Sequence, residues 1–407
     1  MADDKPSDAA PATWAATAGR RPEWTANPEG TGGVVNPPVW RASTVLYSSI
    51  AAMEAANRDQ DGTLFYGRKG TPTTWALREA LTGLEPGAAG TMLYPSGVAA
   101  IAAAILTVVK PGDHILLPDS AYDPTTAFAF GLGKRLGVEA EPYDPLIGGD
   151  IATLFRSNTA LVLLESPGSL TFEVQDIPAI TAAARAAGIP TLLDNTWAAS
   201  LFFKGIPAGC DMVVQALTKY VGGHSDAMMG SVSATPDFFP RLRSTAWHLG
   251  QCVSGDEASL VLRGFRTLPL RMERQQQTGL ELAHWLASHP LVDRVLHPAL
   301  ASCPGHEHWK RDFTGAAGLF GVVLNIGNRE DDAALFCDEL RYFGLGFSWG
   351  GYESLLIPTS PEKLRRVTQF ETTGFSFRIS AGLEEPADLI ADLDRALQRI
   401  AGKYGQG

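Results

Sequence analysis

The sequence predicts an α/β fold with a mostly parallel central sheet, followed by a smaller α+β region. Between about residues 72 and 265, short apolar runs alternate with alanine-rich segments of helical spacing. Near-continuous apolar strands of this kind are typical of parallel sheets that helices cover on both faces. A long helical stretch then runs from Arg263 to about Ser288. After it, strands such as 321–326 mix with helices, which favours α+β.

The expected elements follow in chain order. Residues 1 to about 30 are rich in Ala, Pro, Asp and Gly, so we expect a mobile tail that leads into an arm around residues 35–40. The expected strands of the large sheet are 91–94, 114–117, 160–164, 191–193 and 212–216, with helices such as 98–109 and 177–187 between them. The chain therefore divides into a tail and arm (1–70), an α/β domain (71–265) and an α+β domain (266–407).

Composition and charge exclude several classes of protein. The 407 residues are 45% hydrophobic and 19% charged, as in a globular protein of two or three domains at roughly 150 residues per domain. A formal charge of −11 lacks the basic footprint of a nucleic-acid-binding protein. The longest apolar run, 98–109, is too short for a membrane span of about 20 residues. Four separated cysteines and an acidic start without an export signal favour a cytoplasmic location.

Polar residues gather where the expected strands end, and ligands of open α/β sheets bind beyond such carboxyl ends. Ser96 and Gly97 open a helix whose N–H groups can bind an anion, although a plain capped helix start looks the same. Tyr122 follows the second strand, where a packed surface aromatic is the alternative. Asp194 is either a buried partner for a cation or a helix cap. Small and polar residues follow Lys219 and leave space for a ligand beside its amine.

These residues, taken as an ordered set, fit one cofactor. Pyridoxal 5'-phosphate (PLP) takes a lysine for its Schiff base and a carboxylate beside its pyridinium nitrogen. It also needs an anion-binding cup for its phosphate and a flat surface for its ring. The sequence therefore predicts a PLP site built from Lys219, Asp194, Tyr122 and the helix start at Ser96.

Two other clusters suggest rival sites. Cys303, His306 and His308 lie close together, but no second ligand cluster accompanies them, and a structural zinc site needs four ligands. We therefore predict no metal site. His224 follows Lys219 closely, and we expect it to make structural hydrogen bonds because the lysine is already placed to act as a base.

Longer motifs resemble those of the Cys/Met-metabolism (trans-sulfuration) family of PLP-dependent enzymes. The resemblance runs from about residue 30 to the end of the chain and implies the fold of PLP-dependent transferases, fold type I. Its motifs include Asp194-Asn-Thr-Trp197, Thr218-Lys219-Tyr220 and residues 223–230. Further matches are residues 35–38, 66–68, 96–97, 122–125, 165–173, 348–354 and Arg378.

The resemblance implies a role for each matching residue. Lys219 would hold the cofactor and move the Cα proton, Asp194 would keep the pyridine nitrogen protonated, and Tyr122 would stack on the ring. Arg378 would bind the substrate α-carboxylate through a planar guanidinium. The resemblance implies that the phosphate is bound by Ser96, Gly97, Val98 and Thr218. It implies that the substrate subsite is shaped by Ser348 and Trp349. Two further residues, Tyr66 and Arg68, would reach the phosphate and the substrate from a neighbouring subunit. The implied assembly is a homo-oligomer, a tetramer built from dimers.

Residues 194–198, 165–169 and 347–351 look most like the bacterial β-lyases of the family. The resemblance therefore implies C–S β-elimination that cleaves L-cystathionine, a sulfur amino acid, to homocysteine, pyruvate and ammonia. Cystathionine γ-lyase, γ-synthase and other cysteine-S-conjugate lyase or cysteine desulfhydrase activities are the alternatives, and a cofactor-free scaffold is a rival of another class. Two residues depart from the pattern: Ala216 stands where many members have Ser, and Phe347 where bacterial β-lyases commonly have Tyr.

Overall fold

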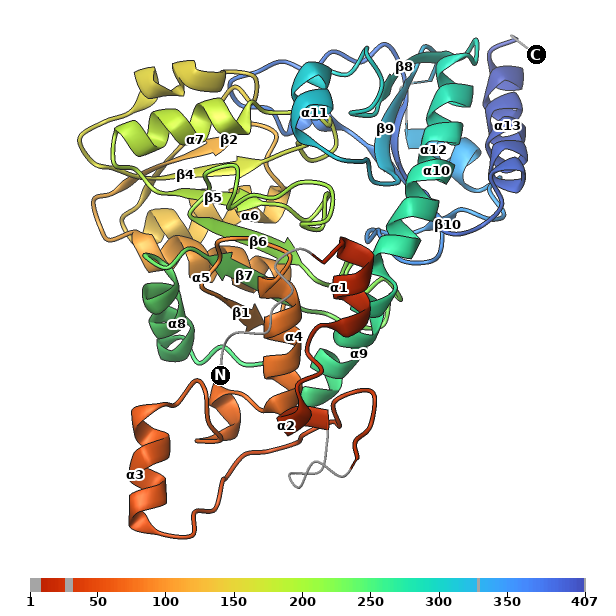
Figure 1. Cartoon of the computed structure of the whole chain (residues 1–407). Coiled ribbons are helices and arrows are strands. Elements are labelled where there is room, and N and C mark those ends of the chain that lie inside the picture. Colours follow the sequence, from red (N-terminus) through yellow and green to blue (C-terminus); the bar gives the residue numbers. More distant parts are fainter. Residues whose placement is uncertain (1–8, 26–31, 328–329, 406–407) are drawn as a thin grey trace.

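A seven-stranded sheet forms the larger half of the molecule (Figure 1). The computed structural model describes residues 9–25, 32–327 and 330–405. The strand order is β1-β7-β6-β5-β4-β2-β3, and only β7 runs antiparallel to its neighbours. The strands are β1 (Gly90–Tyr94), β2 (His114–Pro118), β3 (Glu139–Tyr143), β4 (Thr159–Glu165), β5 (Thr191–Asp194), β6 (Met212–Ala216) and β7 (Gly230–Ala234).

Helices bury both faces of this sheet, which is why its central strands are almost wholly apolar. Leu192 and Val214 pack toward one face, whereas Leu193 and Val213 pack toward the other, because side chains alternate along a strand. The face of Leu192 and Val214 is covered by α5 (Gly97–Val108) and α8 (Phe239–His248). The face of Leu193 and Val213 is covered by α4 (Pro72–Thr82) and α7 (Ile177–Ala186). Helix α6 (Asp123–Phe128) follows β2 in the chain.

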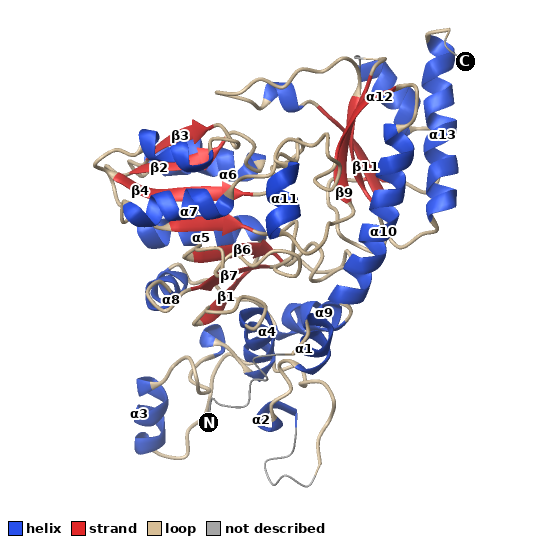
Figure 2. Ribbon diagram, turned by 45° about the horizontal axis from the view of Figure 1, so that its top comes forward, coloured by secondary structure: helices blue, strands red, loops and turns tan. Residues whose placement is uncertain are grey.

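The smaller half is a five-stranded, mostly antiparallel sheet that helices cover (Figure 2). Its order is β10-β11-β12-β9-β8, from β8 (Val292–Leu296), β9 (Leu319–Leu324), β10 (Gly344–Leu345), β11 (Leu355–Thr359) and β12 (Ser376–Ser380). Helices α9 (Gly255–Arg266) and α10 (Leu268–Ala287) lead from one half to the other, and α11 (His306–Asp312), α12 (Glu330–Cys337) and α13 (Pro386–Lys403) complete this half. The predicted fold class is thereby confirmed.

The structure differs from the sequence predictions at three segments. Strands β3 and β7 are absent from the expected set, because β3 carries alternating glutamates at the sheet edge and β7 is the small polar run Gly-Ser-Val-Ser-Ala. Residues 11–18 are not a mobile tail. Here α1 (Pro11–Thr17) packs on the body: Trp14 Nε1 donates to the Ala80 carbonyl and Arg266 to the carbonyls of Ala15 and Ala18. Residues 1–8 and 26–31 of that predicted tail lie outside the described residues.

The segment from residue 32 to 69 is an arm that extends away from the large sheet (Figures 1 and 2). It contains α3 (Ile50–Arg58), and the short α2 (Pro22–Thr25) lies at its base. Several apolar side chains of the arm face solvent in the single chain, and Leu46 is 91% exposed. No helix in the described ranges is long and apolar enough to cross a membrane.

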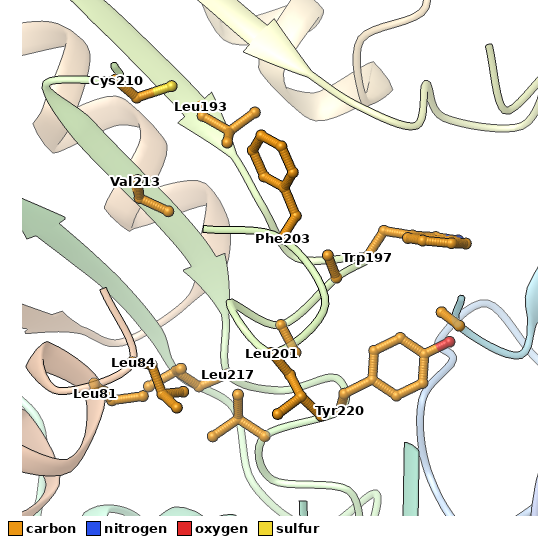
Figure 3. Close-up of a cluster of buried hydrophobic side chains, with 14 of the residues drawn as sticks. Leu81, Leu84, Leu193, Trp197, Leu201, Phe203, Cys210, Val213, Leu217 and Tyr220 are labelled. Atoms are coloured by element: carbon orange, nitrogen blue, oxygen red, sulfur yellow. The ribbon is translucent and has the colours of Figure 1, made fainter. Parts of the chain in front are cut away.

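A buried apolar cluster supports the segments that follow β5 and β6 (Figure 3). Leu193 and Val213 of these strands contribute to it, and Phe203 lies beside Leu193 (Figure 3). Trp197 and Tyr220, which belong to the loops beyond the strands, are almost fully buried in the same cluster. These loops are therefore held rigidly where they carry polar side chains.

Candidate active site

A cavity of about 210 Å³ lies at the carboxyl edge of the large sheet, where the small half packs against it. Most of the predicted site residues line it: Ser96, Gly97, Val98, Tyr122, Asp194, Thr218, Lys219, Trp349 and Arg378. Residues of two matching motifs to which the sequence gave no individual role line it as well: Glu165, residues 167–170 and Phe172 of one motif, and Thr196 of the other. Strand ends that are far apart in the chain therefore meet in one place.

Lys219 presents its amine to this cavity. It lies in the turn after β6, where its backbone N–H donates to the Ala216 carbonyl. Its Nζ donates to Ser348 Oγ at 2.9 Å and lies 5.2 Å from the centre of the Trp349 ring. Burial, together with the nearby Arg378 charge, lowers the pKa of Lys219 to about 8, although Asp194 opposes the change. The free amine, which is the nucleophilic form, is therefore far more populated near neutral pH than in an ordinary lysine.

Asp194 ends β5 and is held by its own turn. Its Oδ1 accepts hydrogen bonds from the Thr196 N–H at 3.0 Å and the Thr196 hydroxyl at 2.5 Å. The same hydroxyl accepts the Ala216 N–H, which ties the ends of β5 and β6 together. Burial raises the pKa of Asp194, while the Thr196 hydrogen bonds and Lys219 lower it. No α-helix begins at Asp194, so its geometry favours a partner for a cation over a helix cap.

Glu165 is a second buried carboxyl beside Asp194. Strands β4 and β5 pair in register, so these two residues are direct neighbours at the sheet edge. Glu165 Oε2 accepts the backbone N–H of Tyr122 at 2.7 Å. Burial, with a contribution from Asp194, raises the pKa of Glu165 well above its usual range, which favours the neutral acid. The strand-end rule that singled out Asp194 also applies to Glu165 and was not used for it.

The first turn of α5 faces the cavity beside these groups. Ser96 caps the helix, since its Oγ accepts the Ala99 N–H at 3.1 Å. The N–H groups of Gly97 and Val98 have no acceptor within the helix and can bind an anion. A Cβ at Gly97 would lie 2.7 Å from the Ala216 Cβ, so glycine allows the helix to approach β6. The Thr218 hydroxyl exchanges hydrogen bonds with the Met229 backbone.

Arg378 reaches the cavity from β12 of the small sheet. Its Nη2 donates to the carbonyls of Phe347 at 2.9 Å and Ser348 at 3.2 Å. Burial lowers the pKa of Arg378 to about 10, although Tyr122 and Tyr220 oppose it. The guanidinium carries five N–H donors and stays charged, so it can bind a carboxylate in the cavity. The small sheet thus contributes a cation opposite the carboxyls of the large sheet.

Two predicted residues, Tyr66 and Arg68, do not reach this cavity within the single chain. Both lie on the arm, where Arg68 Nη1 donates to the Trp247 carbonyl at 3.0 Å and Tyr66 is exposed. Among the other clusters, His224 Nδ1 lies 2.8 Å from the Gly222 carbonyl. The Cys303 thiol donates to the Phe172 carbonyl, whereas His306 Nδ1 lies 2.8 Å from the Pro298 carbonyl oxygen, so these two side chains contact different backbone groups.

The residues of the cavity fit PLP by the chemistry of their groups. A buried amine with a lowered pKa can hold an aldehyde, and the α5 N-terminus can bind a phosphate. The buried Asp194 carboxylate is destabilised by desolvation, and a pyridinium beside it would offset that cost. Tyr122 offers an aromatic ring at the same cavity.

Comparisons with known proteins agree with this chemistry. Residues 22–398 match the family described as Cys/Met metabolism PLP-dependent enzymes. The chain is 44% identical over 375 residues to the cystathionine β-lyase of Escherichia coli, with 90% of this chain and 94% of the relative covered. It is 44% identical over 374 residues to that of Salmonella typhimurium, with the same coverage. A solved cystathionine γ-synthase from Xanthomonas oryzae, in complex with aminoacrylate and cysteine, superposes with a TM-score of 0.86 at 30% identity, covering 97% of this chain and 99% of that one.

Proposed function

Since this chain belongs to the Cys/Met metabolism PLP-dependent enzymes, we propose that it is a carbon–sulfur β-lyase acting on L-cystathionine. With one water molecule, the substrate would yield homocysteine, pyruvate and ammonia. The observation that carries the proposal is the convergence of the Lys219 amine, the Asp194 carboxylate and the Arg378 guanidinium on one cavity. The names of the relatives support the choice of substrate. The proposal includes a cytoplasmic location, which the four free cysteines support.

The chain's own residues would divide the work between binding and proton transfer. When bound, PLP supplies a ring system that takes up the electron pair left when the Cα–H bond breaks. Lys219 would accept the Cα proton, and the lowered pKa of its amine suits a base near neutral pH. Ser348, at 2.9 Å from the amine, would orient it. Arg378 would hold the α-carboxylate, and Asp194 would stabilise positive charge at the ring nitrogen.

The test is product analysis on L-cystathionine with the holoenzyme. Pyruvate together with homocysteine is the expected result, and Lys219→Ala should abolish it. Release of 2-oxobutyrate instead of pyruvate would refute the proposed reaction in favour of γ-chemistry. That alternative is carried by the fold likeness to a solved γ-synthase. A protein that takes up no PLP and releases neither product would be a scaffold.

We further propose that the active site is shared between subunits, as the positions of Tyr66 and Arg68 suggest. Both lie on an arm whose apolar residues Val35, Leu46 and Ile50 are more than half exposed. Exposed apolar groups of this kind mark protein–protein contacts, and a two-fold interface exchanges equivalent segments. Each arm could then place Arg68 beside the partner's phosphate site. We also propose that the chain divides into a tail and arm (1–70), an α/β domain (71–265) and an α+β domain (266–407). The first of these units would contact the neighbouring subunit.

A further inference from the structure

We propose that Asp119, Glu173 and Arg365 form a latch between the two halves of the molecule, and that this latch positions Arg378. The latch acts on the loop of residues 360–375, which joins β11 to β12 in the small sheet and reaches toward the large sheet (Figure 1). The three latch residues are positioning residues, because none of them lines the cavity. The inference rests on the proposed role of Arg378 in binding the substrate carboxylate.

The first part of the latch is Asp119, which directly follows β2 and is only 8% exposed. Its carboxylate accepts the backbone N–H groups of Arg366, Val367 and Thr368 at 2.8–3.1 Å. The Thr368 hydroxyl donates to it as well, at 2.7 Å. Burial alone would raise the pKa of Asp119, but these hydrogen bonds hold it below its usual range. One carboxylate of the large sheet therefore binds a whole turn of the loop.

The second part of the latch is a buried ion pair one residue earlier in the loop. Arg365 Nη2 donates to Glu173 Oε1 at 2.5 Å and also to the Thr171 hydroxyl, and the Arg365 side chain is 4% exposed. Glu173 in turn accepts the Thr171 hydroxyl at 2.6 Å, and its carbonyl accepts the Gly168 N–H. A buried ion pair contributes little net stability because of its desolvation, so its main effect is to fix geometry.

Both parts of the latch connect to the cavity. Thr171 and Glu173 are adjacent to Leu170 and Phe172, which line it. Asp119 lies three residues before Tyr122, which lines the cavity. Ser120 follows Asp119 directly, and its carbonyl accepts the N–H of Ser169, another residue that lines the cavity.

The held loop leads directly into β12, where Arg378 is the third residue. A loop of this length with little secondary structure of its own is uncommon in a compact domain unless contacts order it. The latch therefore anchors to the large half the loop that precedes the strand carrying Arg378. Loss of the latch should move the guanidinium relative to the Lys219 amine.

The first test is a comparison of Arg365→Met with Lys363→Met, an exposed cation of the same loop. Arg365→Met should raise KM for L-cystathionine on the order of ten-fold, because misplacing a charged hydrogen-bond partner weakens binding, while kcat and PLP content stay close to wild type. Lys363→Met should leave both constants unchanged. In an Arg378→Lys background, Arg365→Met should change KM by less than about two-fold, since coupled residues are not additive. An equal KM increase in both backgrounds would overturn the role assigned to the latch.

The second test needs no activity. Hydrogen exchange of the cofactor-free protein should show faster exchange across residues 360–375 in Asp119→Asn than in wild type, and unchanged exchange in Lys363→Met. Unchanged exchange in Asp119→Asn would overturn the latch itself. If the wild type released no pyruvate, the proposed function would be refuted, but the hydrogen-exchange comparison would still show whether Asp119 holds the loop of residues 360–375. If Arg365→Met did not fold, Glu173→Gln, which keeps the volume of the side chain, would take its place in the kinetic comparison.

Discussion

Replacing Lys219 with Met should stabilise the cofactor-free protein at neutral pH. The pKa of Lys219 falls from 10.5 to about 8 on folding, mainly because the amine is buried. Below pH 8 the amine is protonated in both states, so the folded protein bears the full cost of the buried charge. Between pH 8 and 10.5 the unfolded chain binds more protons, so the stability of the wild type rises with pH. A methionine has no charge to bury and removes this cost.

The expected magnitude follows from the size of the pKa change. At about 1.4 kcal/mol per pH unit, the cost of the protonated Lys219 is about 3 kcal/mol at pH 7. Loss of the hydrogen bond to Ser348 subtracts about 1 kcal/mol, which leaves a gain of about 2 kcal/mol. With an unfolding entropy of about 2.1 cal/mol/K per residue, this gain raises Tm by about 2 °C.

The assay is thermal unfolding of the cofactor-free wild type and variant at several values between pH 7 and 10.5. The Tm of Lys219→Met should exceed that of the wild type at pH 7, and the difference should shrink as the pH rises and change sign by pH 10.5, where only the loss of the Ser348 hydrogen bond remains. Lys110→Met, which removes an exposed lysine, should show no such dependence. A lower Tm for Lys219→Met at pH 7, or a difference that does not change with pH, would refute the reasoning.

Three further predictions concern other parts of the site and the core. Asp194→Asn should slow pyruvate release on the order of 100-fold, because one preorganised electrostatic group at the reacting centre is worth about that factor in rate, and should affect Tm far less; normal turnover with a lowered Tm would favour a structural role. Arg68→Ala and Lys219→Ala, each weak or dead alone, should regain activity when mixed as subunits, and mixed oligomers without activity would argue against a shared site. Glu85→Ala should destabilise the protein by about 1–3 kcal/mol in urea unfolding, because the buried carboxyl of Glu85 accepts the Ser200 hydroxyl; a loss below about 0.5 kcal/mol would contradict this.

The large sheet could be predicted from local pattern because its central strands are buried on both faces. Runs such as 160–164 and 212–216 have to be apolar throughout, and they are visible as such in the sequence. Strand β7 escapes the same argument. The hydroxyl of its buried Ser233 finds a partner, Thr91, only after folding brings β1 and β7 together. The mobility expected for residues 11–18 was wrong for a related reason, since the acceptor of the Trp14 N–H lies 66 residues away.

By itself, the sequence determined which side chains end each apolar strand, and parallel strands place such ends at one edge. Local pattern was therefore enough to assign Asp194, Lys219 and the helix start at Ser96 to one cavity. Only the tertiary structure decided which groups became neighbours across long separations. Glu165 meets Asp194 through strand register, and Asp119 meets a loop 247 residues later in the chain. Spacing along the chain does not identify such pairs, because the first arises from the pairing of β4 with β5 and the second from the contact between the two halves of the molecule.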